Sequence, residues 1–264
     1  MGMTEMIEPS KALKGRPDSM RVDEKHFVLG TPMEGPWPEN MKVVIFANGC
    51  FWGSEKGVWR LPGGGIFSTA VGYSAGFTPN PTYEEVCSGR TGATEAVQVV
   101  FDPEKTSLVD ILRWFWEAHD PTCGMGQGND RGTQYRSGLY FFDEEQRLLM
   151  EASRDKYEEA LKKSGKGRGK RITTEIRPAS DFDVPFYYAE GYHQQYLAKP
   201  GARPYCSAQP QEVSLPPFEE WAPAEFTPEL RERHAPKLPE EFWQKHGPKP
   251  HCVIRSPHEP IVFP

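Results

Sequence analysis

The chain has 264 residues, 37% of them hydrophobic and 12% aromatic, which is enough to build at least one enzyme-sized core. Its formal net charge of −6 comes from interspersed acidic and basic residues, so we expect no binding to nucleic acid or to an anionic membrane. The sequence has no apolar run of about 18 residues and no secretory signal pattern. These features predict a soluble cytoplasmic protein whose partners are neutral or small.

The first elements lead up to a cysteine. Residues 1–41 are rich in proline, glycine and charge, which predicts an extended N-terminal arm. Residues 43–47 form a short β-branched apolar run that predicts a buried strand, and Asn48-Gly49 then turns the chain. The mixture of aromatic and charged residues over 51–60 predicts an amphipathic helix. Cys50 is therefore expected at a helix N-terminus.

Further strands are expected at 66–72, 96–101, 138–142 and 172–176, with two helices between them. Ser107 and Asp110 are spaced as a capping box for the first helix, and Asp143 is placed to cap the second. Strands and helices mix without regular βαβ repetition, which favours an α+β fold. We predict a two-layer α/β sandwich with a mixed sheet, a ferredoxin-like plait core and long extended N- and C-terminal segments.

The composition changes after Cys206. Twelve of the 26 prolines fall in residues 210–264, so long helices and central strands are not expected there. The same stretch holds several aromatic residues, too many for a solvated linker, namely Phe218, Trp221, Phe226, Phe242, Trp243 and Phe263. We predict an arm over 1–41, a folded domain over 42–206 and a proline-rich tail over 207–264 that wraps the core. A disordered tail is the alternative.

The five cysteines are odd in number, widely spaced and free of Cys-x-x-Cys pairs, which predicts neither a disulfide framework nor a metal site: Cys50, Cys87, Cys123, Cys206 and Cys252. Most cysteines in such a chain are inert small hydrophobes. Cys50 has a different setting, because unpaired N–H groups at a helix start stabilise a thiolate. Gly49 and Gly53 on either side leave space for a substrate. Cys50 is the candidate nucleophile.

The motif Gly49-Cys50-Phe51-Trp52-Gly53 resembles the signature of the A-type methionine sulfoxide reductases. Matching blocks follow in the same order and spacing, including Thr78-Pro79-Asn80-Pro81-Thr82-Tyr83, Glu95-Ala96-Val97, Gln127-Gly128-Asn129-Asp130, Gly132-Thr133-Gln134-Tyr135-Arg136-Ser137 and His193-Gln194-Gln195-Tyr196-Leu197. The resemblance covers roughly residues 42–206, which makes that segment the expected catalytic reductase domain.

In this family a cysteine attacks the sulfoxide sulfur, and the resemblance implies that this residue is Cys50. The oxygen has to be protonated or strongly hydrogen-bonded before it can leave. By resemblance Glu95 is the acid, and Tyr83 and Tyr135 hold the oxygen. A carboxyl group buried beside aromatic rings has a raised pKa, which suits an acid that works near neutral pH.

The resemblance also implies a substrate pocket. Phe51 and Trp52 would receive the S-methyl group and select the S epimer, and Asp130 would support the polar network. The expected substrate is methionine S-sulfoxide, free or in proteins, so the expected role is the repair of oxidised proteins. Neither a cofactor nor a metal is expected.

After oxygen transfer a second thiol has to resolve the sulfenic acid on Cys50. Cys206 matches the family's first recycling cysteine. Many members have another cysteine shortly before a Leu-Pro-Pro sequence, but this chain has Ser214 there. Cys252 in the tail is the alternative second thiol. Thioredoxin is the family's usual reductant, and a monomer is expected.

Two other classes of function compete with this interpretation. A Cys50/His193 pair would suit an acyl transferase or protease. His193 lies in a patterned aromatic segment, however, and we expect it to have a structural role. A catalytically inactive domain that only binds oxidised methionine is the second alternative, and the intact set of Cys50, Tyr83, Glu95 and Tyr135 argues against it.

Overall fold

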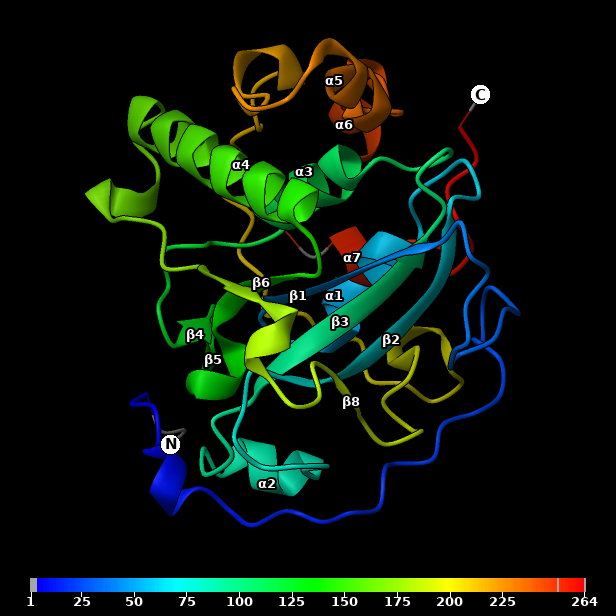
Figure 1. Cartoon of the computed structure of the whole chain (residues 1–264), viewed down its shortest axis with the longest axis vertical. Coiled ribbons are helices and arrows are strands. Elements are labelled where there is room, and N and C mark those ends of the chain that lie inside the picture. The colour runs from blue at the N-terminus through cyan, green and yellow to red at the C-terminus, as the bar shows by residue number, and fades with distance from the viewer. Residues whose placement is uncertain (1–3, 251, 264) are drawn as a thin grey trace.

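The computed structural model describes residues 4–250 and 252–263 (Figure 1). Its strands are β1 (Lys42–Asn48), β2 (Ile66–Ser74), β3 (Thr94–Phe101), β4 (Gly126–Gln127), β5 (Asp130–Arg131), β6 (Ser137–Phe141), β7 (Glu175–Pro178) and β8 (Tyr187–Tyr188). Its α-helices are α1 (Phe51–Trp59), α2 (Tyr83–Cys87), α3 (Leu108–Glu117), α4 (Glu144–Lys163), α5 (Pro228–His234), α6 (Glu240–His246) and α7 (Cys252–Arg255). Short 3₁₀-helices join them, among them η2 (Thr133–Tyr135) and η5 (Tyr196–Ala198).

A six-stranded sheet of order β7-β6-β1-β3-β2-β8 forms the centre of the molecule. β1 pairs antiparallel with β3 and β6, β2 pairs antiparallel with β3 and β8, and β6 pairs parallel with β7. The expected α+β fold with a mixed sheet is therefore confirmed. In the antiparallel register Phe46 lies opposite Val97, so Glu95 comes level with Asn48 at the end of β1, next to Cys50.

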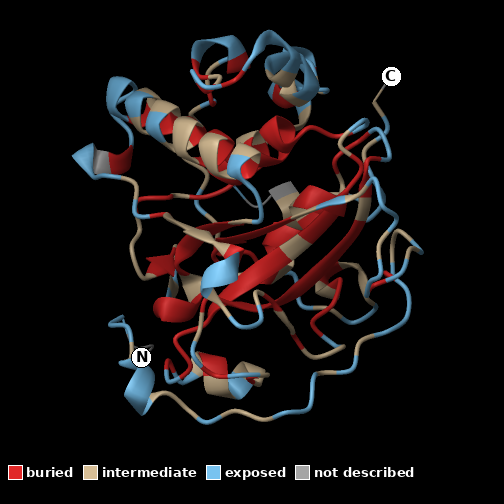
Figure 2. Cartoon of the chain, viewed as in Figure 1, coloured by how far each residue is buried: buried red, intermediate tan, exposed pale blue. Residues whose placement is uncertain are grey.

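The two faces of the sheet have different covers. Val44 and Phe46 point into the main core with α1, α3 and α4, whereas the alternate residues Ile45 and Ala47 belong to a smaller cluster on the other face. That second face is covered by extended chain, including Met33 of the N-terminal arm, which is only 1% exposed. Figure 2 shows the result, with the central strands buried and the outer helices exposed at their surfaces.

Two differences from the sequence expectations concern local hydrogen bonds. The strand expected over 172–176 is wrong at its start, since β7 begins at Glu175. Upstream of it, the Ile172 N–H is bonded to the Glu158 carboxylate and the Thr173 N–H to the Pro121 carbonyl, so neither residue joins the sheet. Helix α2 was not expected. It begins after Thr82, whose side chain forms a capping box with Glu85.

Helix α1 follows the turn at Gly49, whose φ of 99° favours glycine. It is not amphipathic in the expected way, because Glu55 and Lys56 are both buried, at 0% and 1% exposure. The Lys56 ammonium donates to the Ser256 carbonyl at 2.9 Å, so the end of the chain covers this helix. Burial beneath that cover lowers the pKa of Lys56 to about 8.

The tail packs on α3 through specific contacts. The Asp110 carboxylate accepts from the backbone N–H of Lys237 at 2.7 Å and also from the backbone N–H of Ser107, so it faces the helix start, as the expected capping box requires, and holds the tail at the same time. The Ser107 hydroxyl caps the helix through the Val109 N–H. Arg113 forms two hydrogen bonds to Glu240, at 2.6 and 3.1 Å.

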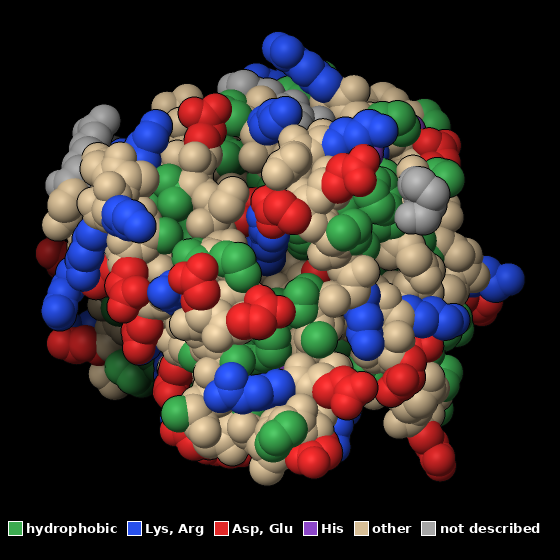
Figure 3. Space-filling view, turned by 90° about the horizontal axis from the view of Figure 1, so that it is seen from above, with side chains coloured by type: hydrophobic (Ala, Val, Ile, Leu, Met, Phe, Trp, Pro, Cys, Tyr) green, Lys and Arg blue, Asp and Glu red, His purple; other side chains and the backbone are tan. Residues whose placement is uncertain are grey.

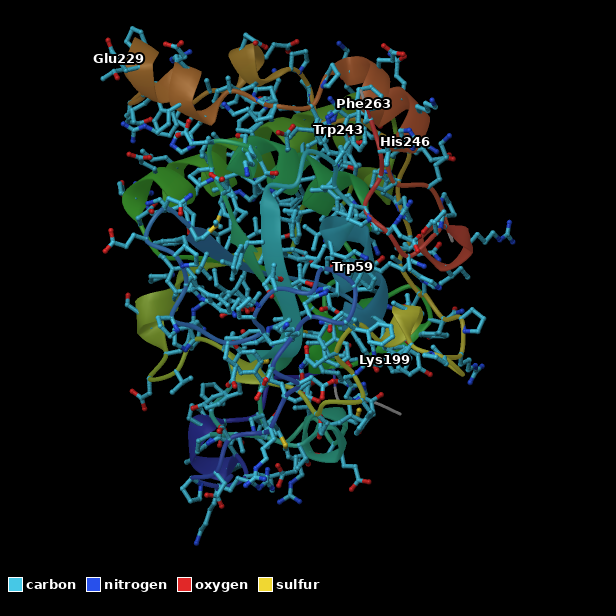
Figure 4. The ribbon with its side chains drawn as sticks, turned by 90° about the vertical axis from the view of Figure 1, so that its right-hand side faces the viewer. Trp59, Lys199, Glu229, Trp243, His246 and Phe263 are labelled. Carbon is cyan, nitrogen blue, oxygen red and sulfur yellow. The ribbon has the colours of Figure 1, made fainter. Side chains whose placement is uncertain are left out.

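The last residues return to α1. The Trp59 indole donates to the His258 carbonyl at 2.8 Å, and the Ile261 N–H donates to the Arg60 carbonyl at 2.8 Å. Figure 4 shows Trp243 and Phe263 near one another on the same side of the molecule, with Trp59 below them. Phe242 lies between these segments and is 1% exposed, so the tail contributes to the core.

None of the helices in the described part of the chain combines the length and hydropathy that a bilayer crossing requires. Acidic and basic side chains alternate over the face that carries the tail helices (Figure 3). That face therefore offers no large field of a single sign.

Candidate active site

Cys50 is the N-cap residue of α1 and remains partly exposed. The Trp52 N–H donates to its sulfur and lowers the thiol pKa, as expected at a helix start. Burial and the nearby Glu95 carboxylate act more strongly, and together they raise the pKa of Cys50 well above its ordinary value. The stabilisation expected from the helix start is therefore present, but desolvation outweighs this one N–H donor.

Glu95 lies on β3 and is 2% exposed. Its Oε2 accepts from the Phe51 N–H at 3.0 Å, which places the carboxyl group beside the first residue of α1. Burial raises the pKa of Glu95 to about 8, and the Asp130 carboxylate adds to the effect. The group therefore carries a proton at neutral pH, and its repulsion of a thiolate on Cys50 is then absent.

Two tyrosines lie near this carboxyl group. Tyr83 and Tyr135 are half-buried, and the pKa of each is raised by desolvation first and by the charge on Glu95 second. Both hydroxyls therefore stay protonated and can donate hydrogen bonds. The Tyr83 hydroxyl bonds to the sulfur of Cys87, which gives Cys87 a local role that the sequence did not indicate.

Aromatic rings form the wall next to Cys50. The Trp52 indole stacks on Tyr196 with ring centroids 3.9 Å apart, and its N–H donates to His193 Nδ1 at 3.0 Å. The ring of Phe51 lies 5.2 Å from that of His193. These rings, two predicted and two from residues 193–196, make an apolar surface suited to a small apolar group.

Asp130 is held by a residue that sequence reasoning missed. The Tyr205 hydroxyl donates to Asp130 Oδ1 at 2.5 Å, and the Tyr205 ring meets Trp52 edge-on. Asp130 Oδ2 is buried and has no hydrogen-bond partner among the described residues. The only signal in the sequence was the position of Tyr205 directly before Cys206.

Cys206 packs against the first turn of α1. A Cβ added at Gly53 would lie 2.9 Å from the Cys206 Sγ, so a larger residue at position 53 would force the Cys206 side chain to move. Neither Cys50 nor Cys206 is in a disulfide in this structure, and a charge on Cys206 raises the pKa of Cys50. A cavity of about 50 Å³ adjoins Cys206 and is lined in part by tail residues, including Val253 and Ile261. The side chain of Cys252 lies outside the described part of the structure.

The geometry does not favour the Cys50/His193 pair. His193 Nδ1 is occupied by the Trp52 indole, and burial lowers the pKa of His193 to about 4. Its Nε2 has no hydrogen-bond partner among the described residues, so no bond to Cys50 activates the thiol. No cluster of three or more metal-ligating side chains occurs in residues 4–250 and 252–263.

A neutral carboxyl group beside a thiol, next to an apolar ring wall, defines a thiol-dependent oxidoreductase site that can protonate an oxygen while sulfur is attacked. The family model described as peptide methionine sulfoxide reductase matches residues 42–222. The protein MsrA of Salinispora arenicola is 53% identical over 215 residues, which cover 80% of this chain and 93% of that protein. The Azotobacter vinelandii protein MsrA is 54% identical over 80% of this chain and 93% of its own length.

A solved structure agrees with these relatives. Methionine sulfoxide reductase A of Corynebacterium diphtheriae is 42% identical, has a TM-score of 0.67 and covers 76% of this chain and 93% of that one. The chain therefore belongs to the peptide methionine sulfoxide reductase family and is an enzyme of the MsrA class. This family membership argues against the two alternatives, an acyl transferase or protease and a domain that only binds oxidised methionine.

Proposed function

We propose that this enzyme reduces methionine S-sulfoxide, free or within peptides and proteins, and thereby repairs oxidised proteins. The observation that carries the proposal is the buried Glu95 carboxyl group, held on the Phe51 N–H beside Cys50 and protonated at neutral pH. An acid that keeps its proton near neutral pH suits the removal of a sulfoxide oxygen.

In the proposed first step the Cys50 sulfur attacks the sulfoxide sulfur while Glu95 protonates the oxygen. Tyr83 and Tyr135 donate hydrogen bonds to that oxygen, which stabilises the charge that develops on it. The oxygen passes to Cys50, so the thiol and the sulfoxide become a sulfenic acid and a thioether. The proton that Glu95 gives to the oxygen stays in the sulfenic acid, and the thiol proton of Cys50 replaces it on Glu95, so no external co-reactant is needed for this step.

The rings of Phe51 and Trp52 are proposed to receive the S-methyl group. Their apolar surface favours the methyl group over the oxygen, and the donors lie around Glu95, so one configuration at sulfur fits better than the other. We propose that the accepted configuration is S. Asp130 is proposed to support the polar side of the site through its bond to Tyr205.

In the proposed second step the Cys206 thiol attacks the sulfenic acid on Cys50 and releases water. The packing of Cys206 against Gly53, within the first turn of α1, supports this assignment. The resulting Cys50–Cys206 disulfide is proposed to be reduced by thioredoxin through thiol–disulfide exchange. The reaction then requires neither a metal nor an organic cofactor.

The organisation of the chain is also part of the proposal. Residues 42–206 are proposed to form the catalytic domain, with a ferredoxin-like plait core supported by the strand order β6-β1-β3-β2. Residues 1–41 and 207–264 are proposed to be an arm and a tail that cover it. A monomer in the cytoplasm stays the prediction from the sequence.

The proposed specificity is tested by measuring methionine formation from the separate S and R epimers of a dabsylated methionine sulfoxide. The assay contains thioredoxin, its reductase and NADPH. Turnover of the S epimer with no measurable turnover of the R epimer is expected. Equal rates for the two epimers would contradict the proposed binding of the methyl group against Phe51 and Trp52.

The recycling step is tested with Cys206→Ser. We expect this variant to form one equivalent of methionine and then to stop, because thioredoxin has no disulfide to reduce. Addition of a small thiol such as dithiothreitol is expected to restore cycling. Cys252→Ser is measured in parallel. If Cys206→Ser cycles with thioredoxin and Cys252→Ser stalls, the tail cysteine resolves the sulfenic acid in place of Cys206.

A further inference from the structure

Glu55 is a fully buried carboxyl group that the proposed chemistry does not use. It lies on α1 one turn after Phe51 and is 0% exposed. Three donors surround it and no salt bridge neutralises it among the described residues. Its Oε1 accepts from Gln195 Nε2 at 2.6 Å and from the Thr69 hydroxyl at 2.9 Å, and its Oε2 accepts from the Gln195 N–H at 2.8 Å. Burying a carboxyl group is costly, so these bonds must be made for the fold to keep it.

Two of these bonds hold Gln195 in an uncommon backbone conformation. Its φ is 47°, in the left-handed region that residues other than glycine rarely adopt. His193 and Tyr196, which lie on either side of Gln195 in the chain, provide two of the four rings that form the aromatic wall next to Cys50. His193 accepts from the Trp52 indole, and Tyr196 stacks on the same ring. The conformation of Gln195 therefore sets where both rings lie relative to α1.

The N-terminal arm joins the same network. Gln195 Oε1 accepts from the Phe27 N–H at 3.1 Å, and the Thr69 hydroxyl is bonded to His26 Nε2 at 2.8 Å. His26 Nδ1 in turn accepts from the N–H groups of Val28 and Leu29, which fixes the proton on Nε2. Glu55 thus connects α1, β2, the segment 193–196 and the arm at one point.

We propose that Glu55 is a positioning residue that fixes the aromatic wall of the substrate pocket through Gln195. Glu55 acts through Gln195 and does not touch the substrate. This inference rests on the proposed function, since it concerns the pocket for the methyl group. A loosened wall weakens the binding of substrate and leaves Cys50, Glu95 and the two tyrosines in place, so the effect falls on KM more than on kcat.

The test compares Glu55→Gln with the wild type in steady-state kinetics on methionine S-sulfoxide, with dithiothreitol as the reductant. The introduced amide sets an N–H group against one of the three donors, so one hydrogen bond becomes a repulsive contact. KM is expected to rise about tenfold, with kcat changed by less than about threefold. A KM within about twofold of the wild type would overturn the inference.

A reciprocal exchange separates positioning from a general loss of stability. In the double variant Glu55→Gln with Gln195→Glu, an amide again faces a carboxylate across the same pair, and the backbone N–H of residue 195 keeps an acceptor. The KM of the double variant is expected to return most of the way to the wild-type value. If it is no better than either single variant, the contact is not what fixes the pocket, and the inference fails.

The matched control is Glu145→Gln, which removes a carboxylate on α4 that pairs with Arg233 and His234 of the tail. Its KM is expected to equal that of the wild type. Failure of the wild type to reduce the S epimer would instead overturn the proposed function, and this inference with it. Normal wild-type kinetics with an unchanged KM in Glu55→Gln would overturn this inference alone.

Discussion

Replacement of Cys50 by serine is expected to abolish the reduction of methionine sulfoxide, by at least about 10⁴-fold in kcat. The serine hydroxyl has a far higher pKa than a thiol and is a poor nucleophile toward sulfur. It also cannot form the sulfenic acid that carries the oxygen away from the substrate. The loss should persist when dithiothreitol replaces thioredoxin, because the missing step precedes recycling. Methionine formation in a single-turnover assay is the measurement.

The matched control for Cys50→Ser is Cys123→Ser. Cys123 is also a free, partly exposed thiol, but it lies near Asp120 and Gly128, outside the group of residues around Glu95. Its replacement should leave kcat unchanged within about twofold. Substantial activity in Cys50→Ser would refute the proposed nucleophile whatever the behaviour of the other cysteines.

Glu95→Gln is expected to lower kcat/KM by about 10²- to 10⁴-fold, the usual range for loss of a general acid. The amide has nearly the shape of the carboxyl group and keeps an oxygen to accept from the Phe51 N–H. It has no proton to transfer. In the wild type the activity should fall as the pH rises through about 8, where Glu95 loses its proton. The residual activity of the variant should not fall as the pH rises through about 8. A fall of activity at that pH in the variant would show that another group is the acid.

The same substitution is expected to stabilise the fold at alkaline pH. The pKa of Glu95 is raised from an ordinary value of 4.5 to about 8 in the folded chain. The contribution of Glu95 to the stability of the fold is therefore fully present below pH 4.5 and is lost as the pH rises through about 8. At about 1.4 kcal/mol per pKa unit, the free energy of unfolding of Glu95→Gln should exceed that of the wild type by about 5 kcal/mol at about pH 8.5 and by less than about 1 kcal/mol at about pH 5. Urea unfolding at the two pH values measures this.

Several elements could be predicted because their signals are local. The β-branched run before Asn48-Gly49 predicted β1, and the turn after it predicted that Cys50 would begin a helix, as it does. Helix α2 was missed because it is only five residues long and too short for a periodic pattern. The sequence signal for its start is the capping box of Thr82 and Glu85.

The burial of Glu55 and Lys56 had no local signal. Both residues occupy positions where a surface helix would carry charge, and the sequence around them gives no sign of what covers them. The covers are Gln195 and Ser256, which lie 140 and 200 residues away along the chain. Hydrogen bonds between residues so far apart in the chain form only in the tertiary structure, so no local sequence pattern predicts them.

The sequence by itself determined the fold class, the position of Cys50 at a helix start and the set of residues that resemble a methionine sulfoxide reductase site, because these depend on neighbours in the chain. Only the tertiary structure decided the charge of the site. The antiparallel register of β1 and β3 brings Glu95 to Phe51, and burial then raises the pKa of Glu95 and of the Cys50 thiol. Desolvation is produced by every atom packed around a group, and most of those atoms come from distant parts of the chain.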